Sequence, residues 1–134
     1  MTNFTALQAL ADEKGITIDR ISCPISKSMS LSLDGKCFIG IDKECSGSEE
    51  LVRTAHELGH CETGAFYNRY SKFNVISKLE YKADKWAVQE LVPYDELNDA
   101  LEKGYTEKWQ LAELFGVTEE MIERAVYIYK ATMG

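Results

Sequence analysis

The segment LVRTAHELGHC, residues 51–61, contains His56, Glu57 and His60 in a His-Glu-x-x-His pattern. On a helix, residues four apart project from the same face, about 6 Å apart along the axis. His56 and His60 at this spacing can bind one zinc ion. Glu57 is rotated about 100° from His56, so it can lie beside the metal and accept a proton from a water molecule. The chain has only two histidines, and both fall in this pattern.

A catalytic zinc ion needs three protein ligands and one open position, so a third ligand must come from another part of the chain. Because no further histidine exists, that ligand must be a carboxylate or a thiolate. The best candidate is Glu80, in a helix predicted over about 77–92 that stops before Pro93. Asp84 lies four residues later on the same face. It can accept a hydrogen bond from the second ring nitrogen of a zinc-bound histidine and so fix the tautomer.

Other interpretations of these residues stay open. Glu80 and Asp84 also fit an ordinary exposed helix face, on which they would pair with Lys78, Lys82 and Lys85. Glu62 and Glu90 are weaker ligand candidates. Cys61 follows His60 but points about 100° away from it, which is typical of a packed thiol rather than a ligand.

A metal, a base and a water molecule at one site predict hydrolysis of a peptide bond. Zinc would polarise the scissile carbonyl and lower the pKa of its bound water toward ~7. Glu57 would take the proton and pass it to the leaving amine. The reaction also needs a donor to the oxyanion, for which Tyr67, Tyr70 and Tyr81 are candidates. These tyrosines fit equally well as residues that pack or face solvent.

The first third of the chain predicts a small sheet. Residues 16–22 look extended, and Met29, Leu31 and Leu33 alternate with serines. Asp34-Gly35 is a strong two-residue turn signal, and the alternation continues on the return strand from residue 37 to 41. This predicts a β-hairpin with one face buried. An exposed edge of the hairpin at residues 28–42 could hold a substrate as an added strand, or the hairpin could only cover the core.

Helices fill the rest of the chain. Ser46 to Glu49 has the form of a capping box before a helix over about 49–61, and residues 63–76 are irregular. Further helices are expected over about 3–14, 94–103, 106–115 and 118–131. We therefore expect an α+β fold, with a small antiparallel sheet packed on several helices. The 134 residues predict a single domain with a core at about 25–93 and C-terminal helices at about 94–131 packing on it.

Composition restricts the possible partners. The net charge of -7 and the pI of about 4.9 disfavour DNA or RNA as a direct partner. Residues 111–122 resemble a helix-turn-helix, but the second helix would begin Thr118-Glu119-Glu120, which would repel phosphate.

No apolar run approaches the ~20 residues that span a bilayer and no signal peptide is evident, so a cytoplasmic protein is expected. The four cysteines are then expected to be free thiols.

Two motifs in order point to a known family. Residues 54–60, TAHELGH, are followed by residues 80–87, EYKADKWA, and by Leu91-Val92-Pro93. Together they resemble the ImmA/IrrE metallopeptidases, compact gluzincin-like enzymes common in phages and mobile elements. The resemblance covers roughly residues 25–130. Residues 64–68, GAFYN, look like the short, phage-type members.

The resemblance implies a zincin-like core with one zinc bound by His56, His60 and Glu80, and Glu57 as the catalytic base. It also implies a helix-turn-helix repressor as the substrate. The rival hypothesis is a non-catalytic zinc domain that binds a partner and cuts nothing. A structural zinc site normally has four protein ligands, and metal binding alone does not require Glu57, so the sequence favours the enzyme.

Overall fold

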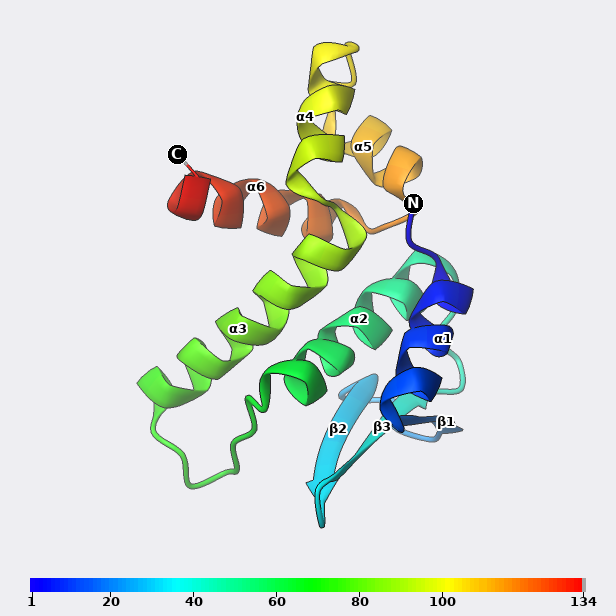
Figure 1. Ribbon diagram of the computed structural model, residues 1–134, viewed down its shortest axis with the longest axis vertical. Coiled ribbons are helices and arrows are strands. Elements are labelled where there is room, and N and C mark those ends of the chain that lie inside the picture. Colours follow the sequence, from blue (N-terminus) through cyan, green and yellow to red (C-terminus); the bar gives the residue numbers. More distant parts are fainter. Residues whose placement is uncertain (134) are drawn as a thin grey trace.

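The structure, a computed structural model, describes residues 1–133 (Figure 1). Within these residues one helix precedes three strands, and five helices follow them. In order they are α1 (Phe4–Lys14), β1 (Thr17–Ile21), β2 (Ser28–Leu33), β3 (Lys36–Asp42), α2 (Gly47–Thr63), α3 (Phe73–Leu91), α4 (Tyr94–Glu102), α5 (Lys108–Phe115) and α6 (Glu119–Met133). The predicted α+β class is confirmed.

The three strands form one mixed sheet in the order β1-β3-β2. β2 and β3 are the predicted antiparallel hairpin, and its turn residues Asp34 and Gly35 have the positive φ angles, 51° and 77°, that a tight hairpin turn requires. The prediction of a wholly antiparallel sheet is wrong, because β1 pairs with β3 in parallel. Sequence alternation reports which face a residue occupies, but not which strand lies beside it.

One face of the hairpin is buried, but on β2 it is the serine face. Ser28 pairs with Ile41 and Ser30 with Ile39, so the serines share the inner face with these buried side chains. Met29, Leu31 and Leu33 therefore point outward, with 39%, 43% and 54% of their surfaces exposed. The inner face is covered by α2, which places a serine hydroxyl beside the His-Glu-x-x-His helix.

The helices pack around one apolar core, in which α2 and α3 lie side by side (Figure 1). Leu58, Ala87 and Val88 are fully buried between these elements. α3 begins at Phe73, four residues earlier than predicted, and the predicted capping box does not form because Ser46 makes no side-chain cap bond. The C-terminal helices pack on the end of α3 through α6. No helix within residues 1–133 is long and apolar enough to cross a bilayer.

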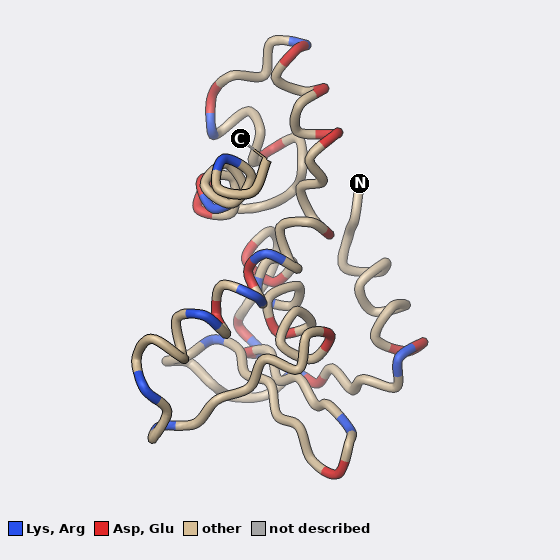
Figure 2. Tube along the Cα trace, turned by 60° about the vertical axis from the view of Figure 1, so that its left-hand side comes forward, with Lys and Arg blue, Asp and Glu red and all other residues tan. Residues whose placement is uncertain are grey.

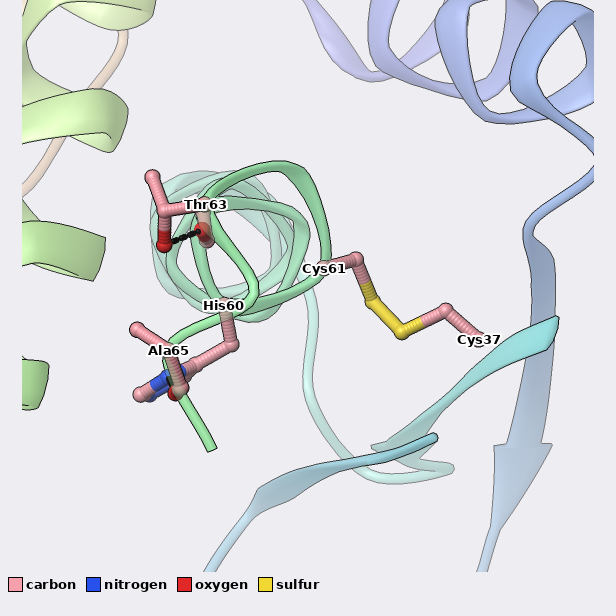
Figure 3. Close-up of a disulfide and its surroundings, with 6 residues drawn as sticks. Cys37, His60, Cys61, Thr63 and Ala65 are labelled. Carbon is pink, nitrogen blue, oxygen red and sulfur yellow. Dashed lines mark hydrogen bonds between the residues drawn. A yellow bond between two sulfur atoms is a disulfide. The ribbon is translucent and has the colours of Figure 1, made fainter. Parts of the chain in front are cut away.

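A disulfide joins Cys37 of β3 to Cys61 of α2 (Figure 3). The prediction of four free thiols is therefore wrong for this pair, and only Cys23 and Cys45 are free. The two bonded residues lie 24 positions apart in the chain, but their Cα atoms are 6.0 Å apart because β3 packs against α2. The bond ties the sheet to the helix one residue after His60.

Candidate metal centre

His56 and His60 project from the same face of α2, as their spacing of four residues predicts. The Nε2 atoms of His56 and His60 lie 3.2 Å apart. Each Nδ1 atom has a partner on the other side of its ring: Asp84 Oδ1 is 2.8 Å from that of His56, and the Ala65 carbonyl oxygen is 2.5 Å from that of His60. Both Nε2 atoms are therefore turned toward one point, as metal ligands would be.

α3 supplies the third group through an unusually close approach to α2. A Cβ atom added to Gly59 would lie 2.5 Å from the Ala83 carbonyl oxygen, so only glycine fits at this crossing. The approach brings Glu80 to the histidines, with its Oε2 2.9 Å from His56 Nε2 and its Oε1 3.3 Å from His60 Nε2. One turn later on α3, Asp84 reaches the back of the His56 ring.

His56, His60 and Glu80 form a group that could hold a metal ion. They form the cluster of potential ligands found among residues 1–133. Ligand atoms held about 2.0–2.1 Å from a tetrahedral zinc lie about 3.3 Å from one another. The Nε2 atoms of His56 and His60, 3.2 Å apart, are close to that value. Glu80 faces the two rings with different oxygens, and one potential ligand atom from each of the three residues lies within 4.8 Å of the others. Two imidazoles and one carboxylate would thus hold an ion and leave its fourth position open.

The three groups also perturb one another's pKa. Burial would lower the pKa of His56, but its hydrogen bonds to Asp84 and Glu80 outweigh burial and raise the pKa to about 10. Burial opposes ionisation of His60 too, yet Glu80 and the Ala65 carbonyl raise its pKa. Hydrogen bonds from His56 and His60 hold the pKa of Glu80 far below its ordinary value. Glu80 is therefore ionised at neutral pH, as a metal-ligating carboxylate must be.

Glu57 lies beside this cluster without belonging to it. Its side chain is buried, and its Oε2 accepts a hydrogen bond of 2.7 Å from the Ser28 hydroxyl on β2. Glu57, both histidines, Glu80 and Ser28 line one cavity of about 350 Å³. A group that binds in the cavity thus meets the potential ligands and the carboxylate of Glu57 together.

The three candidate tyrosines occupy different places. Tyr67 lines the cavity, and its hydroxyl donates a hydrogen bond to Glu80. That bond raises the pKa of Tyr67 to about 12, so the phenol is protonated at neutral pH. Tyr70 is 80% exposed, and Tyr81 lines a different hollow on α3. Only Tyr67 is brought to the site.

The weaker ligand candidates lie outside the cluster. Glu62 pairs with Lys14 at 3.7 Å, and Glu90 belongs to neither the cluster nor the cavity lining. Figure 3 shows the Cys61 side chain leaving α2 toward Cys37, in a different direction from the His60 ring.

Three further residues, Ser28, Arg53 and Gly59, shape the site, although the sequence pattern did not predict a role for them. Arg53 lies one turn before His56 and is held by Glu49 at 3.1 Å and by the Ser26 carbonyl at 3.1 Å. Arg53 lines the cavity that contains the potential metal ligands, which we call the metal cavity. It also lines a second hollow of about 420 Å³, which reaches the start of α6 at Thr118 and Met121. Arg53 precedes His56 by three residues on the same helix, so its place beside the site could have been predicted from the sequence. No sequence pattern near Ser28 predicts its contact with Glu57.

Comparison with known families agrees with this geometry. The chain matches the model of the peptidase M78 family, the IrrE N-terminal-like domain, over residues 11–127. The chain belongs to this family. The resemblance to ImmA/IrrE metallopeptidases that the two motifs indicate is thereby confirmed. No curated protein and no solved structure matches this M78 chain.

Proposed function

We propose that this M78 chain is a zinc-dependent endopeptidase that cleaves a helix-turn-helix repressor encoded by a phage or mobile element. The observation that carries the proposal is the convergence of His56, His60 and Glu80, with the carboxylate of Glu57 in the same cavity. Three protein ligands are the number that catalytic zinc sites have, whereas structural sites normally have four.

His56, His60 and Glu80 would hold the zinc. When bound, zinc would supply Lewis-acid polarisation of the scissile carbonyl and a lowered pKa for water at the site. Glu57 is placed to take a proton from that water and to return it to the leaving amine. Asp84 accepts the Nδ1 proton of His56 and so keeps Nε2 free for the metal.

Tyr67 is our candidate for the residue that stabilises the oxyanion. Its phenol lines the cavity, and with a pKa of about 12 it retains the proton that such a donor needs. Its hydrogen bond to Glu80 holds the hydroxyl beside the cluster.

The free edge of β2 is our candidate for binding the substrate backbone. β2 lies at the edge of the sheet, and Ser28, Met29 and Ser30 line the metal cavity. An extended segment of substrate could add to this edge by main-chain hydrogen bonds and so pass over the metal. The alternative, that the hairpin only covers the core, predicts no dependence of cleavage on β2.

The repressor substrate and the cytoplasmic location are supported by the family resemblance. A repressor acts on DNA inside the cell, and this acidic chain would meet it through protein contacts rather than by binding DNA. The second candidate function is a non-catalytic zinc module that controls a repressor by binding alone.

Metal analysis and one active-site variant separate these functions. We expect about one zinc per chain by elemental analysis of the purified protein, and a sharp loss in Glu80→Ala. Manganese or iron in place of zinc would revise the metal but not the site. Glu57→Gln should keep the zinc and abolish cleavage of a repressor encoded beside the gene. Tyr67→Phe should keep the zinc and slow cleavage roughly 10- to 1,000-fold.

Two outcomes would count against the peptidase. A wild-type protein that takes up no metal after incubation with zinc would rule out both zinc-dependent functions. Unchanged repressor control in Glu57→Gln cells would favour the binding module.

A further inference from the structure

A basic and aromatic surface stands out on this acidic protein. The net charge is -7, yet residues 63–79 include Arg69, Lys72 and Lys78 and no acidic residue. Lys82 and Lys85 follow Lys78 at helical spacing, so these three lysines share one face of α3. Figure 2 shows blue segments without red ones along the loop that leads into α3, whereas red segments gather on α4 at the other end of the molecule.

These cations lack partners of opposite charge. Within residues 1–133, none of the five cations from Arg69 to Lys85 forms an ion pair, although other basic residues of the chain do. Two of the three acidic residues of the same helix, Glu80 and Asp84, contact His56 at the metal centre instead. Like charges four apart on a helix destabilise it slightly, so the lysine face does not serve helix stability.

Two aromatic side chains project into solvent beside these cations. Tyr70 is 80% exposed and Phe73 is 83% exposed. The turn that carries Tyr70 is ordered: Asn68 Oδ1 accepts from the Tyr70 amide at 2.8 Å, and the Ser71 hydroxyl accepts from the Asn68 amide at 3.1 Å. The exposure therefore belongs to a locally fixed conformation, and covering these rings would remove a large apolar area from water.

The lysine face also lines a shallow, open hollow. Ser77, Lys78, Tyr81, Lys82 and Lys85 line a space of about 510 Å³ on α3. A hollow lined by one aromatic residue and three lysines suits a ligand that carries carboxylates together with apolar side chains.

The loop part of this surface, residues 69–73, leads away from the metal centre along the chain. Tyr67, in the loop that leads to Tyr70, donates a hydrogen bond to Glu80. Lys78, Lys82 and Lys85 lie on another face of α3, about 140–160° around the helix from Glu80. A polypeptide that leaves the metal cavity past Tyr67 could therefore follow the loop to Arg69, Tyr70 and Phe73 and continue around the start of α3 to the lysines.

We propose that Arg69, Tyr70, Lys72, Phe73, Lys78, Lys82 and Lys85 bind an acidic, partly apolar segment of the protein substrate outside the stretch that is cut. This inference rests on the proposed peptidase function for the identity of the ligand as substrate. The carboxylates of an acidic peptide can pair with the cations, and its apolar side chains can pack on the exposed rings. A DNA duplex, with one charge per ~1.7 Å, would meet the repulsion of a chain whose net charge is -7.

Binding can be measured on the full chain by fluorescence anisotropy. The probe is a labelled synthetic peptide that alternates glutamate with leucine and phenylalanine, and it is compared with the same peptide carrying glutamine and with a short labelled DNA duplex. The double substitution Lys78→Gln with Lys82→Gln should weaken binding of the acidic peptide by at least about threefold. Lys36→Gln with Lys43→Gln removes the same charge from the hairpin region and should change binding by less. Phe73→Ala should weaken binding, and Tyr127→Ala, which removes another exposed ring on α6, should not.

Three results would overturn the proposal: equal weakening by both lysine pairs, equal binding of the glutamine peptide, or tighter binding of the DNA duplex. The last result would make nucleic acid the ligand. Peptide binding should persist in zinc-free protein, so binding without cleavage counts against the peptidase alone. Repressor cleavage that the Lys78 and Lys82 substitutions leave unchanged, with no peptide binding, counts against this surface alone.

Discussion

Gly59 of α2 packs directly against the backbone of Ala83 on α3, so closely that a Cβ atom at residue 59 would lie 2.5 Å from the Ala83 carbonyl oxygen. This contact sets the separation of the two helices that carry the potential metal ligands. Glu80 is three residues before Ala83, and His60 directly follows Gly59. The position of the third ligand therefore depends on a residue that has no side chain.

Gly59→Ala should weaken both folding and metal binding. Alanine would favour the isolated helix by about 1 kcal/mol, but the clash with fixed backbone should cost roughly 1–3 kcal/mol, and the helices must separate. We expect a lower zinc affinity by chelator competition and a lower melting temperature, with a larger effect for Gly59→Val. Full zinc affinity in Gly59→Val would contradict this role for the close contact.

Ser28→Ala should impair catalysis without affecting the metal. The Ser28 hydroxyl is the hydrogen-bond donor to buried Glu57, so its loss leaves the carboxylate less firmly placed. We expect kcat for peptide cleavage to fall roughly tenfold, while KM and zinc content change little. Ser28→Thr keeps the hydroxyl and should restore much of kcat. A threonine variant as slow as the alanine variant would point to a packing effect instead.

Asp84→Asn should lower zinc affinity by about 10- to 100-fold, because a neutral amide polarises and orients the His56 ring less than a carboxylate does. Chelator competition measures the change. Asp99→Asn is a matched control, since Asp99 pairs only with Lys103 on the surface. Equal zinc affinities for the two variants would show that the His56–Asp84 contact is irrelevant to the metal.

Zinc affinity should rise with pH. In the metal-free protein the pKa of His56 is raised to about 10, so at neutral pH a metal ion must displace its proton. Zinc affinity therefore increases as pH rises toward 10, by up to about tenfold per pH unit for this one proton, and levels off above that pH. Chelator competition between about pH 6 and pH 8 tests this expectation. Asp84→Asn should flatten the dependence, because it removes a group that raises the His56 pKa. A pH-independent affinity would contradict the protonated state of His56.

The Cys37–Cys61 disulfide should stabilise the fold. Closing a loop between residues 24 positions apart should contribute roughly 2–4 kcal/mol, which reduction or Cys37→Ser would remove. Urea unfolding with and without a reductant measures this difference. Thiol titration of the unfolded, non-reduced protein should find Cys23 and Cys45 only. Four reactive thiols before reduction would show that the bond is not formed in the purified protein.

Several features followed from sequence because they are local. The His56–His60 spacing and the Asp34-Gly35 turn depend on backbone geometry within a few residues, and the structure agrees with both. Glu80 and Asp84 could be predicted because they lie four residues apart on a second helix, and because residues 80–87 resemble a motif of the family. Their placement against the histidines depended on α3 packing beside α2.

Only the tertiary structure decided the rest, because those features join residues that are distant in the chain. The parallel pairing of β1 with β3 and the inward serine face of β2 depend on how strands are arranged, which alternation does not encode. The Ser28–Glu57 hydrogen bond and the Cys37–Cys61 bond exist because the sheet packs on α2. The sequence by itself thus determined which groups could carry the chemistry, since spacing along one helix orients them. Packing between elements determined which of those groups meet, because contact across the core depends on helix separation and strand order.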